Sequence, residues 1–452
     1  MDSIFLNYSI GQILEKYQKG ELSPLDAARA SVKRVKKLES VFKAWVCFDE
    51  EKLLTEAKTL KLPASPDDYR LLEGVPFGVK DIFNTADFPT QMGSPLWKNF
   101  TPGNDARAVF NIKRRGAIIP GKTVTAEFAV HTLDKTLNPH DISKTPGTSS
   151  SGSAVAVALG MIPAALGTQT AGSIVRPASF CGVYGFKPSF GLIPRTGTLK
   201  TTDSLDTIGF FTVFQKDLKR VFEAIRVCGS NYPFSSSALR DKERQSPPKG
   251  RPWKVAFIRT HTWDNAHDYA QKSMLEFVEK LSLSPNIKVD EVKLPAIMQK
   301  AHQVHATIYN KTLSYYFKKE FQKSELVSPI MNDLIKLGQK ISVADYQKAL
   351  GEQVKMQKAM DDFLKNYDTA ISLGTAGEAP ERNEIEQPDP ALIWTLSHLP
   401  VASIPQFVSP SLMPFGLQIF SRKYNDYLLL NFIEYLASLK IIPEKPNPLL
   451  KI

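Results

Sequence analysis

The stretch TPGTSSSGSAVAVALGMIPAALGTQTAGSIVRPASFCGVYGFKP, residues 145–188, determines how the fold of this chain is interpreted. Its first loop, residues 145–153, and its second loop, residues 167–173, are rich in small residues and hydroxyl groups. A small apolar helix is predicted between them, over residues 153–159. Loops joined by one helix–strand unit can converge at one end of a sheet, where α/β proteins place their sites. Small residues let backbone N–H groups approach a ligand closely, so we predict a functional site at these loops.

The residues alone leave open how a serine of these loops would be activated. No GxSxG elbow, HExxH motif, GxGxxG motif or P-loop pattern occurs. The histidines lie in no catalytic signature, although a Ser-His-Asp triad stays an alternative because triads form in space. A lysine base is the economical choice, because a buried lysine loses its charge and can accept a proton. Lys80 follows apolar residues near the end of a strand predicted over residues 75–81, which is compatible with such burial.

The composition excludes several classes of protein. Of 452 residues, 42% are hydrophobic and 23% are charged, as in soluble globular proteins. Cys47, Cys181 and Cys228 are widely spaced, so neither a disulfide framework nor a zinc site is expected. The N-terminus does not resemble a signal peptide, and no run of about 18 apolar residues occurs. We therefore expect a cytoplasmic protein that binds no membrane, no metal and no cofactor.

The charge of the chain is basic, with 57 Lys and Arg against 46 Asp and Glu, or +11 at pH 7. Such a charge invites a nucleic-acid interpretation. However, the basic residues are scattered, and the densest cluster, residues 33–37, lies in a predicted helix where a solvated face explains it. No zinc-finger or RNP1-like segment accompanies it. We therefore expect no nucleic-acid partner.

The predicted elements alternate between helix and strand. Short apolar runs separated by Gly, Ser, Thr and Pro fill residues 71–215, which indicates an α/β sheet with helices on both faces. The polar, Pro-rich residues 235–252 are interpreted as a surface loop inside one domain. The remaining predictions are helices within residues 9–39 and at 49–60, 106–116, 295–365 and 425–439, and strands at 44–48, 117–120, 253–258, 367–372 and 399–404.

Four separated motifs resemble the amidase signature family of hydrolases. Residues 145–197 match its Gly- and Ser-rich signature, and residues 74–81 match its lysine strand, GVP-x-x-VKD. Residues 204–209, SLDTIG, and residues 416–418, GLQ, are similar to two later elements, in the same order. The resemblance implies one α/β domain over residues 1–452, with a large mixed β-sheet covered by helices on both faces. Its regions would be a helical one (1–70), the signature core (71–215) and a variable helical substrate-pocket region (295–365).

The same resemblance implies a Ser-cisSer-Lys triad. The family's residues fall on Ser173 as nucleophile, Ser149 as proton shuttle after a cis peptide bond, and Lys80 as base. The two serines are 24 residues apart, which is the family's own spacing. Backbone N–H groups of residues 170–173 would hold the oxyanion: Thr170, Ala171, Gly172 and Ser173. Such donors matter as much as the triad, since one is typically worth roughly 2.7–4 kcal/mol of barrier.

Several residues depart from the family pattern around the nucleophile. The usual Asp-x-Gly-Gly-Ser reads Gln169-Thr170-Ala171-Gly172-Ser173, and the usual arginine lies one position later, at Arg176. Thr148 and Ser151 replace glycines of the first loop. Arg176, Gln169 and Ser150 are candidate substrate-binding residues, and Arg176 could equally brace the loop. These departures argue against a glutamine-hydrolysing member of an amidotransferase complex.

The leading prediction is an amidase that cleaves a linear carboxamide bond of a small molecule through an acyl-enzyme. One alternative is the glutamine-hydrolysing A-type subunit of an amidotransferase complex, which would need partner subunits. Another is a catalytically silent scaffold member, against which the complete triad speaks. The expected partner is a small-molecule amide, and a homodimer is the candidate assembly. The sequence does not identify the substrate.

Overall fold

Neighbouring residues of the central strands point into different hydrophobic clusters. Ala164 and Leu166 belong to one cluster, whereas Ala165 between them belongs to another. Phe210 and Phe211 divide in the same way. Because side chains alternate along a strand, this pattern means that both faces of the sheet are buried. A computed structural model of the chain describes residues 3–227, 246–247, 250–384 and 386–446.

One mixed sheet of eleven strands forms the centre of the described chain, in the order β1-β3-β2-β4-β6-β5-β10-β11-β9-β7-β8. The strands β2, β3 and β4 run parallel to one another, as do β7, β8 and β9, and the remaining pairs are antiparallel. Their bounds are β1 (Trp45–Phe48), β2 (Phe77–Lys80), β3 (Gly121–Thr123), β4 (Ala164–Gln169), β5 (Tyr184–Lys187), β6 (Thr207–Thr212), β7 (Trp253–Ile258), β8 (Ile287–Val292), β9 (Thr369–Leu373), β10 (Val401–Val408) and β11 (Pro414–Phe420).

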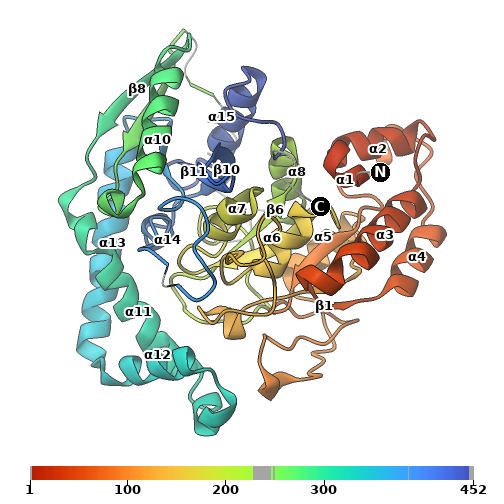
Figure 1. Cartoon of the computed structure of the whole chain (residues 1–452), viewed down its shortest axis with the longest axis horizontal. Helices are drawn as coiled ribbons and strands as arrows, with labels where there is room; N and C mark the ends of the chain where they lie inside the picture. Colours follow the sequence, from red (N-terminus) through yellow and green to blue (C-terminus); the bar gives the residue numbers. More distant parts are fainter. Residues whose placement is uncertain (1–2, 228–245, 248–249, 385, 447–452) are drawn as a thin grey trace.

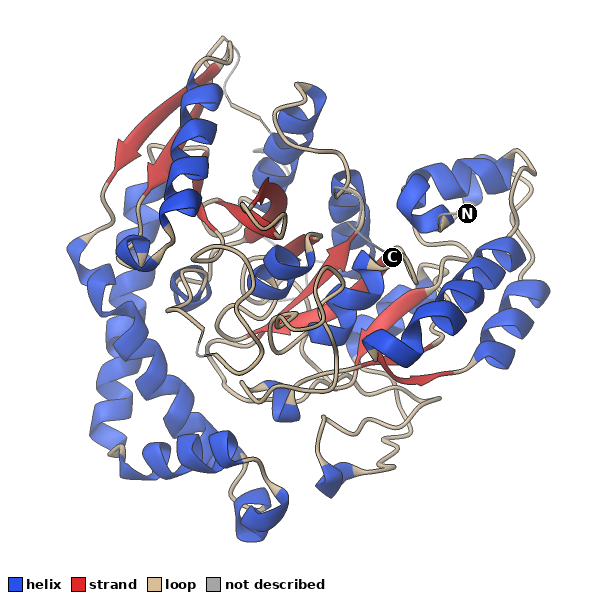
Figure 2. Cartoon of the chain, in the orientation of Figure 1, coloured by secondary structure: helices blue, strands red, loops and turns tan. Residues whose placement is uncertain are grey.

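Helices surround this sheet (Figures 1 and 2). Their bounds are α1 (Ile4–Asn7), α2 (Ile10–Gln18), α3 (Pro24–Phe42), α4 (Glu50–Thr59), α5 (Arg107–Arg114), α6 (Ser151–Ala158), α7 (Val175–Cys181), α8 (Gln215–Ile225), α10 (Asp268–Ser282), α11 (Ala301–Tyr316), α12 (Pro329–Lys340), α13 (Val343–Leu364), α14 (Leu392–Leu396) and α15 (Asp426–Ser438). None of the described helices is long and apolar enough to cross a bilayer.

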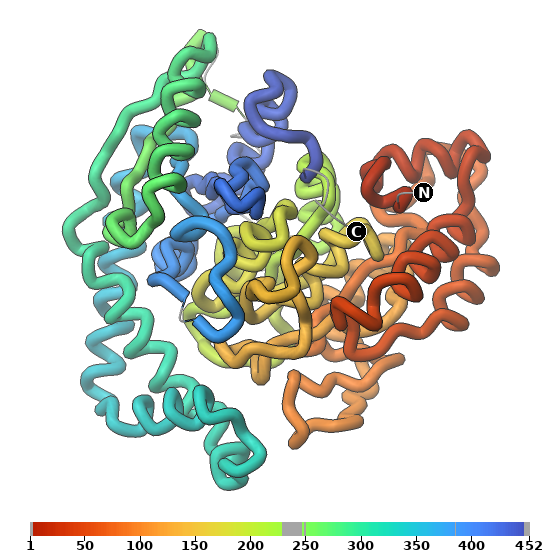
Figure 3. The backbone as a smooth tube through the Cα atoms, viewed as in Figure 1, coloured from red at the N-terminus to blue at the C-terminus, as the bar shows by residue number. Residues whose placement is uncertain are grey.

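Each face of the sheet has its own set of helices. Residues of α2, α5, α8, α10 and α15 share one hydrophobic cluster with the first face. On the other face, α6 packs over β4 and β6, and α7 packs over β5, β10 and β11. The helices α11 to α14 share a hydrophobic cluster with residues of β9, β10 and β11. Figure 3 shows the α11–α13 segment on the opposite side of the view from the N-terminal helices. The chain is therefore a single α/β domain with a mixed sheet covered on both faces, as the sequence predicts.

Local sequence signals explain several boundaries. Ser23 Oγ accepts the N–H of Asp26, and the Asp26 carboxylate accepts the N–H of Ser23, so these two residues form a capping box at the start of α3. The strand predicted over residues 117–120 is wrong. Only Ile118 forms an isolated bridge there, and the strand of this segment is β3, which begins after Pro120. Proline has no N–H to give to a ladder, so strand pairing begins after it. Most of the predicted loop at 235–252 lies outside the described residues.

Candidate active site

Lys80 occupies the carboxyl end of β2, beside the parallel strand β4. Its side chain is fully buried. The Nζ atom lies within hydrogen-bond distance of three hydroxyl oxygens, at 2.8 Å from Ser149 Oγ, 3.0 Å from Ser150 Oγ and 3.0 Å from Thr168 Oγ1. The structure thus brings together two of the three predicted catalytic side chains at the edge where α/β sheets place their sites.

The environment of Lys80 favours a neutral amine. Burial lowers the pKa of Lys80 to about 7, and the charges of Asp134 and Asp206 act in the opposite direction. Among the described residues, no carboxylate lies within ion-pair distance of Nζ. A buried amine that lacks a direct counter-ion loses the stabilisation of its charge. Lys80 can therefore accept a proton near neutral pH.

Ser149 lies two residues before the start of α6. The Thr148–Ser149 peptide bond is cis, so this expectation from the resemblance is confirmed. The side chain of Ser149 is only 1% exposed, and its carbonyl oxygen accepts the N–H of Ala126 at 3.1 Å. Ser151, in the first turn of α6, donates to the half-buried carboxylate of Asp134. The first loop is thus fixed by backbone and side-chain contacts on both sides of Ser149.

Residues 170–173, the last part of the second loop, form a turn between β4 and α7. Within the described chain, none of its four consecutive N–H groups donates a hydrogen bond. Buried N–H groups are rarely left unpaired, so such a row indicates a site for an oxygen of a ligand. Ser173 is 6% exposed, and its Oγ has no hydrogen-bond partner among the described residues. The turn therefore presents the Ser173 hydroxyl together with four backbone N–H donors.

The carbonyl oxygens of this turn, by contrast, are held from outside it. Those of residues 170–172 each accept one hydrogen bond from a different part of the chain. The donors are His305 Nε2 to Thr170 at 2.9 Å, Thr395 Oγ1 to Ala171 at 2.7 Å, and the Arg176 N–H to Gly172 at 2.8 Å. The first two donors come from α11 and α14, far away in sequence.

Gln169 caps the helix that follows the nucleophile. Its Oε1 accepts the N–H groups of Ile174 at 2.8 Å and Val175 at 3.0 Å, and its Nε2 donates to Thr395 Oγ1 at 3.0 Å. An amide oxygen accepts both N–H groups as the family's usual carboxylate could, which explains how Gln fits this position. Gln169 and Ser150 are both fully buried, and neither is among the described residues that line the cavity bordering the turn.

Glycine is required at position 172 by a close neighbour. A Cβ atom on Gly172 would lie 1.8 Å from the Asp389 Oδ2 atom. The carboxylate therefore packs directly against the turn, and any side chain there would displace it. Asp389 comes from the loop before α14.

Arg176 connects the two loops to this same carboxylate. Its NH1 lies 2.6 Å from Glu386 Oε2 and 3.5 Å from Asp389 Oδ2, and its NH2 donates to the carbonyl oxygen of Thr148 at 3.1 Å. The guanidinium is 7% exposed. Two bound carboxylates already neutralise Arg176, so the structure shows the bracing contact that the sequence left open. Arg176 also lines the cavity.

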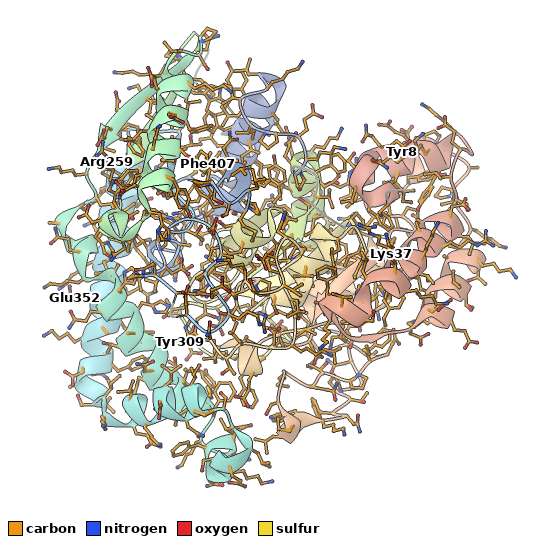
Figure 4. All side chains as sticks on the ribbon, viewed as in Figure 1. Tyr8, Lys37, Arg259, Tyr309, Glu352 and Phe407 are labelled. Atoms are coloured by element: carbon orange, nitrogen blue, oxygen red, sulfur yellow. The ribbon has the colours of Figure 1, made fainter. Side chains whose placement is uncertain are left out.

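A cavity of about 730 Å³ borders the turn at Ala171, and Lys80, Ser149 and Ser173 are not among its described lining residues. Thr148 and Ala171 lie in its wall, and α11, α12 and the loop before α14 supply most of the remainder. The predicted pocket region, residues 295–365, thus contributes to it. Tyr309 of α11 is one lining residue, and Figure 4 labels it beside that helix, toward the centre of the view. Apolar walls with a few polar groups are typical of small-molecule sites.

Sequence reasoning missed His305, Thr395 and Asp389. His305 was among histidines without a signature, and Thr395 precedes the predicted strand at 399–404 without any motif. Their contacts join residues 135 and 224 positions apart, which no local spacing reveals. Only the burial of a polar residue among apolar neighbours could have signalled them.

Comparison with known proteins now identifies the family. The family model described as Amidase matches residues 26–430. The chain belongs to the amidase signature family. Its fold and its motifs agree with this membership, which makes it an enzyme of the class that acts on carbon–nitrogen bonds of amides.

Similar proteins point to one branch of the family. The chain is 29% identical to the A-type subunit of glutamyl-tRNA(Gln) amidotransferase from Solidesulfovibrio magneticus, over 97% of this chain and 98% of that protein. It resembles the structure of the corresponding protein from Thermotoga maritima, with a TM-score of 0.81, 25% identity, and coverage of 99% and 98%. The peptide amidase of Stenotrophomonas maltophilia shares the fold, with a TM-score of 0.81, 22% identity, and coverage of 98% and 99%.

These likenesses bear on the expected activity. The departures at Gln169, Ala171 and Arg176 argued against a member of an amidotransferase complex, whereas the curated relatives carry that name. The comparisons therefore favour the alternative interpretation over a stand-alone amidase. Gln169 makes the contacts that its position requires, so its presence is no obstacle to this alternative.

Proposed function

We propose that this chain hydrolyses a linear carboxamide, with Ser173 as nucleophile, Ser149 as proton shuttle and Lys80 as base. One observation carries the proposal. A fully buried lysine, whose pKa burial lowers to about 7, lies 2.8 Å from the hydroxyl of Ser149. Lys187 is equally buried and its pKa is also lowered to about 7, but its Nζ donates to the carbonyl oxygens of Pro188 and Leu399. Lys80 instead contacts hydroxyl groups, which can pass it a proton, so its surroundings favour proton transfer.

The proposed reaction has two steps. Ser173 Oγ attacks the carbonyl carbon and its proton passes to Ser149 Oγ, while the proton of Ser149 passes to the neutral Lys80 amine. The carbon–nitrogen bond then breaks, and the same relay returns a proton to the leaving amine or ammonia. An acyl-Ser173 ester remains. Water attacks this ester with the relay again as base, which releases the acid and restores Ser173.

The row of N–H groups at residues 170–173 supports the proposal. Negative charge develops on the former carbonyl oxygen when Ser173 attacks, and fixed donors stabilise it. The turn holds its four N–H groups free of described partners beside Ser173. We assign the oxyanion hole to this turn. One such donor is typically worth roughly 2.7–4 kcal/mol of barrier.

Among carboxamides, we propose the side chain of glutamine as the first substrate to test. The names of the curated relatives support it, since a protein of that name would release ammonia from glutamine for use in a complex. Glutaminase activity that appears only when a partner protein is added would favour this assignment. Full turnover of other small amides by the chain alone would favour a stand-alone amidase.

A panel of amides tests the function itself. Glutamine, short peptide amides and aliphatic amides are supplied to the wild type and to Ser173→Ala, and release of ammonia or amine is measured. We expect turnover of at least one amide by the wild type and its loss in the variant. Folded wild-type protein that turns over no amide, with or without partner proteins, would favour a scaffold.

A further inference from the structure

We propose that His305 and Thr395 are positioning residues that aim the oxyanion-binding N–H groups of the catalytic turn. This inference rests on the proposed function and adds two residues to it. Neither belongs to the Ser- and Gly-rich segment, and each reaches the turn from a helix that contributes to the cavity wall. Both contacts are to carbonyl oxygens, not to the reacting atoms.

The planar shape of the peptide group couples each carbonyl oxygen to the N–H of the next residue. A trans peptide is planar, so the carbonyl oxygen of one residue and the N–H of the next point in opposite directions. A hydrogen bond that holds the Thr170 oxygen therefore also fixes the direction of the Ala171 N–H. Likewise, a bond to the Ala171 oxygen fixes the N–H of Gly172. The N–H groups that would face the oxyanion are therefore oriented by hydrogen bonds to the carbonyl oxygens on the opposite side of the same peptides.

His305 holds the first of these peptides. It lies on α11 with 4% of its surface exposed, and its Nε2 is 2.9 Å from the Thr170 oxygen. A carbonyl oxygen can only accept, so Nε2 carries the hydrogen. Burial lowers the pKa of His305 to about 4, so the ring stays neutral in the tautomer that the contact requires. His305 also lines the cavity, so one side chain borders the cavity and contacts the turn.

Thr395 holds the second peptide. Its side chain is fully buried, and its hydroxyl donates to the Ala171 oxygen at 2.7 Å while accepting from Gln169 Nε2 at 3.0 Å. The accepted bond turns the hydroxyl hydrogen toward Ala171, because one hydroxyl has a single hydrogen to give. Gln169 thus acts on the turn twice, through this hydroxyl and through its cap on α7.

The third peptide needs no side chain. The Gly172 oxygen accepts the N–H of Arg176 in the first turn of α7. Helix geometry therefore sets the Ser173 N–H whatever residue stands at 176. The direction of the Ala171 and Gly172 N–H groups, by contrast, depends on the side chains of His305 and Thr395. It therefore depends on the packing of α11 and α14 against the turn. We infer that these two helices prepare the turn for catalysis.

Paired variants test the inference. His305→Phe and Thr395→Val keep size and remove the donor, whereas His305→Gln and Thr395→Ser keep a donor. Thr312→Val is the matched control, because Thr312 is a buried threonine of α11 whose hydroxyl, among the described residues, bonds only to its own helix. The probe is an alkyl fluorophosphonate, which forms a bond between Ser173 Oγ and phosphorus and expels fluoride. The rate of labelling, kcat and KM on the best amide, and thermal unfolding are measured.

The expected result is a selective loss in rate. His305→Phe and Thr395→Val should each lower kcat and the labelling rate by about tenfold or more, a part of what one oxyanion donor supplies, with KM little changed. His305→Gln and Thr395→Ser should restore most of the rate, and Thr312→Val should retain it. Folded Phe and Val variants with wild-type kcat and labelling would overturn the inference. An unlabelled, inactive wild type would instead count against the proposed function.

Discussion

Lys80 Nζ lies 2.8 Å from Ser149 Oγ in a site where Lys80 is fully buried and Ser149 is 1% exposed. The two residues are 69 positions apart in the chain. The parallel pairing of β2 with β3 places Lys80 beside Thr123, and the residues that follow β3 hold the loop that carries the serine. Among the described residues, two other hydroxyl groups also lie within hydrogen-bond distance of the amine. The relationship places a base one proton transfer away from a serine.

The pH dependence of activity should report Lys80. Its pKa is lowered from 10.5 to about 7, so the amine is charged below that pH and neutral above it. We expect kcat/KM to fall as the pH drops through about 7 and to level off above it. Lys80→Met should lower activity by about 10²–10⁴-fold and abolish this limb. An unchanged limb in the variant would assign the titration to another group.

Ser149 and Ser150 both contact the lysine, and their variants should differ. Ser150 Oγ also accepts the Thr168 N–H at 3.3 Å and donates to the Thr168 oxygen at 3.2 Å, which ties it to β4. Ser149→Ala removes the proposed shuttle and should lower kcat by about 10²–10⁴-fold. Ser150→Ala should lower kcat much less and shift mainly thermal stability. The reverse ranking in steady-state kinetics would move the shuttle to Ser150.

Gln169 should contribute to stability through its cap on α7. Gln169→Ala leaves the N–H groups of Ile174 and Val175 buried without an acceptor, and we expect a loss of about 1–3 kcal/mol in the free energy of unfolding. Gln169→Glu keeps the acceptor and loses the donor to Thr395, so it should recover part of the stability. Chemical denaturation checks both. Equal stability of the alanine variant and the wild type would contradict the capping contact.

Gly172 should tolerate no side chain. In Gly172→Ala the added Cβ would meet the carboxylate of Asp389, so the loop before α14 or the turn itself must move. We expect a loss of activity of about tenfold or more, because displaced N–H groups stabilise the oxyanion less. Gly351→Ala, in α13 with open space around it, is the control and should retain activity. Similar kinetics for both variants would show that the contact is unimportant.

The sequence predicted those features that depend on local chemistry or on motifs. Ser23 and Asp26 are capping residues at the start of α3. The lysine of the GVP-x-x-VKD motif lies at the end of β2 beside Ser149. Pro120 shows where prediction from local sequence fails. The apolar run before it indicated a strand, but β3 pairs with its neighbours only from Gly121 onward. The sheet order could not be read from periodicity, which reports one element at a time.

The surroundings of the site were predicted less well than its central residues. Arg176 was expected either to bind substrate or to brace the loop, and only its neighbours Glu386 and Thr148 show the brace. His305 and Thr395 donate to carbonyl oxygens, and a carbonyl is present at every residue. No sequence pattern therefore marks such a contact, and the fold must be known before it is visible.

The identity of the nucleophile is tested most directly by mass spectrometry after fluorophosphonate labelling. Wild-type protein and Ser173→Ala are incubated with the probe, and the modified peptide is located by fragmentation. We expect one adduct per chain, on Ser173, and none in the variant, with labelling of the wild type slowed as the pH falls below about 7. An adduct on another residue, or equal labelling of the variant, would contradict the assignment of Ser173.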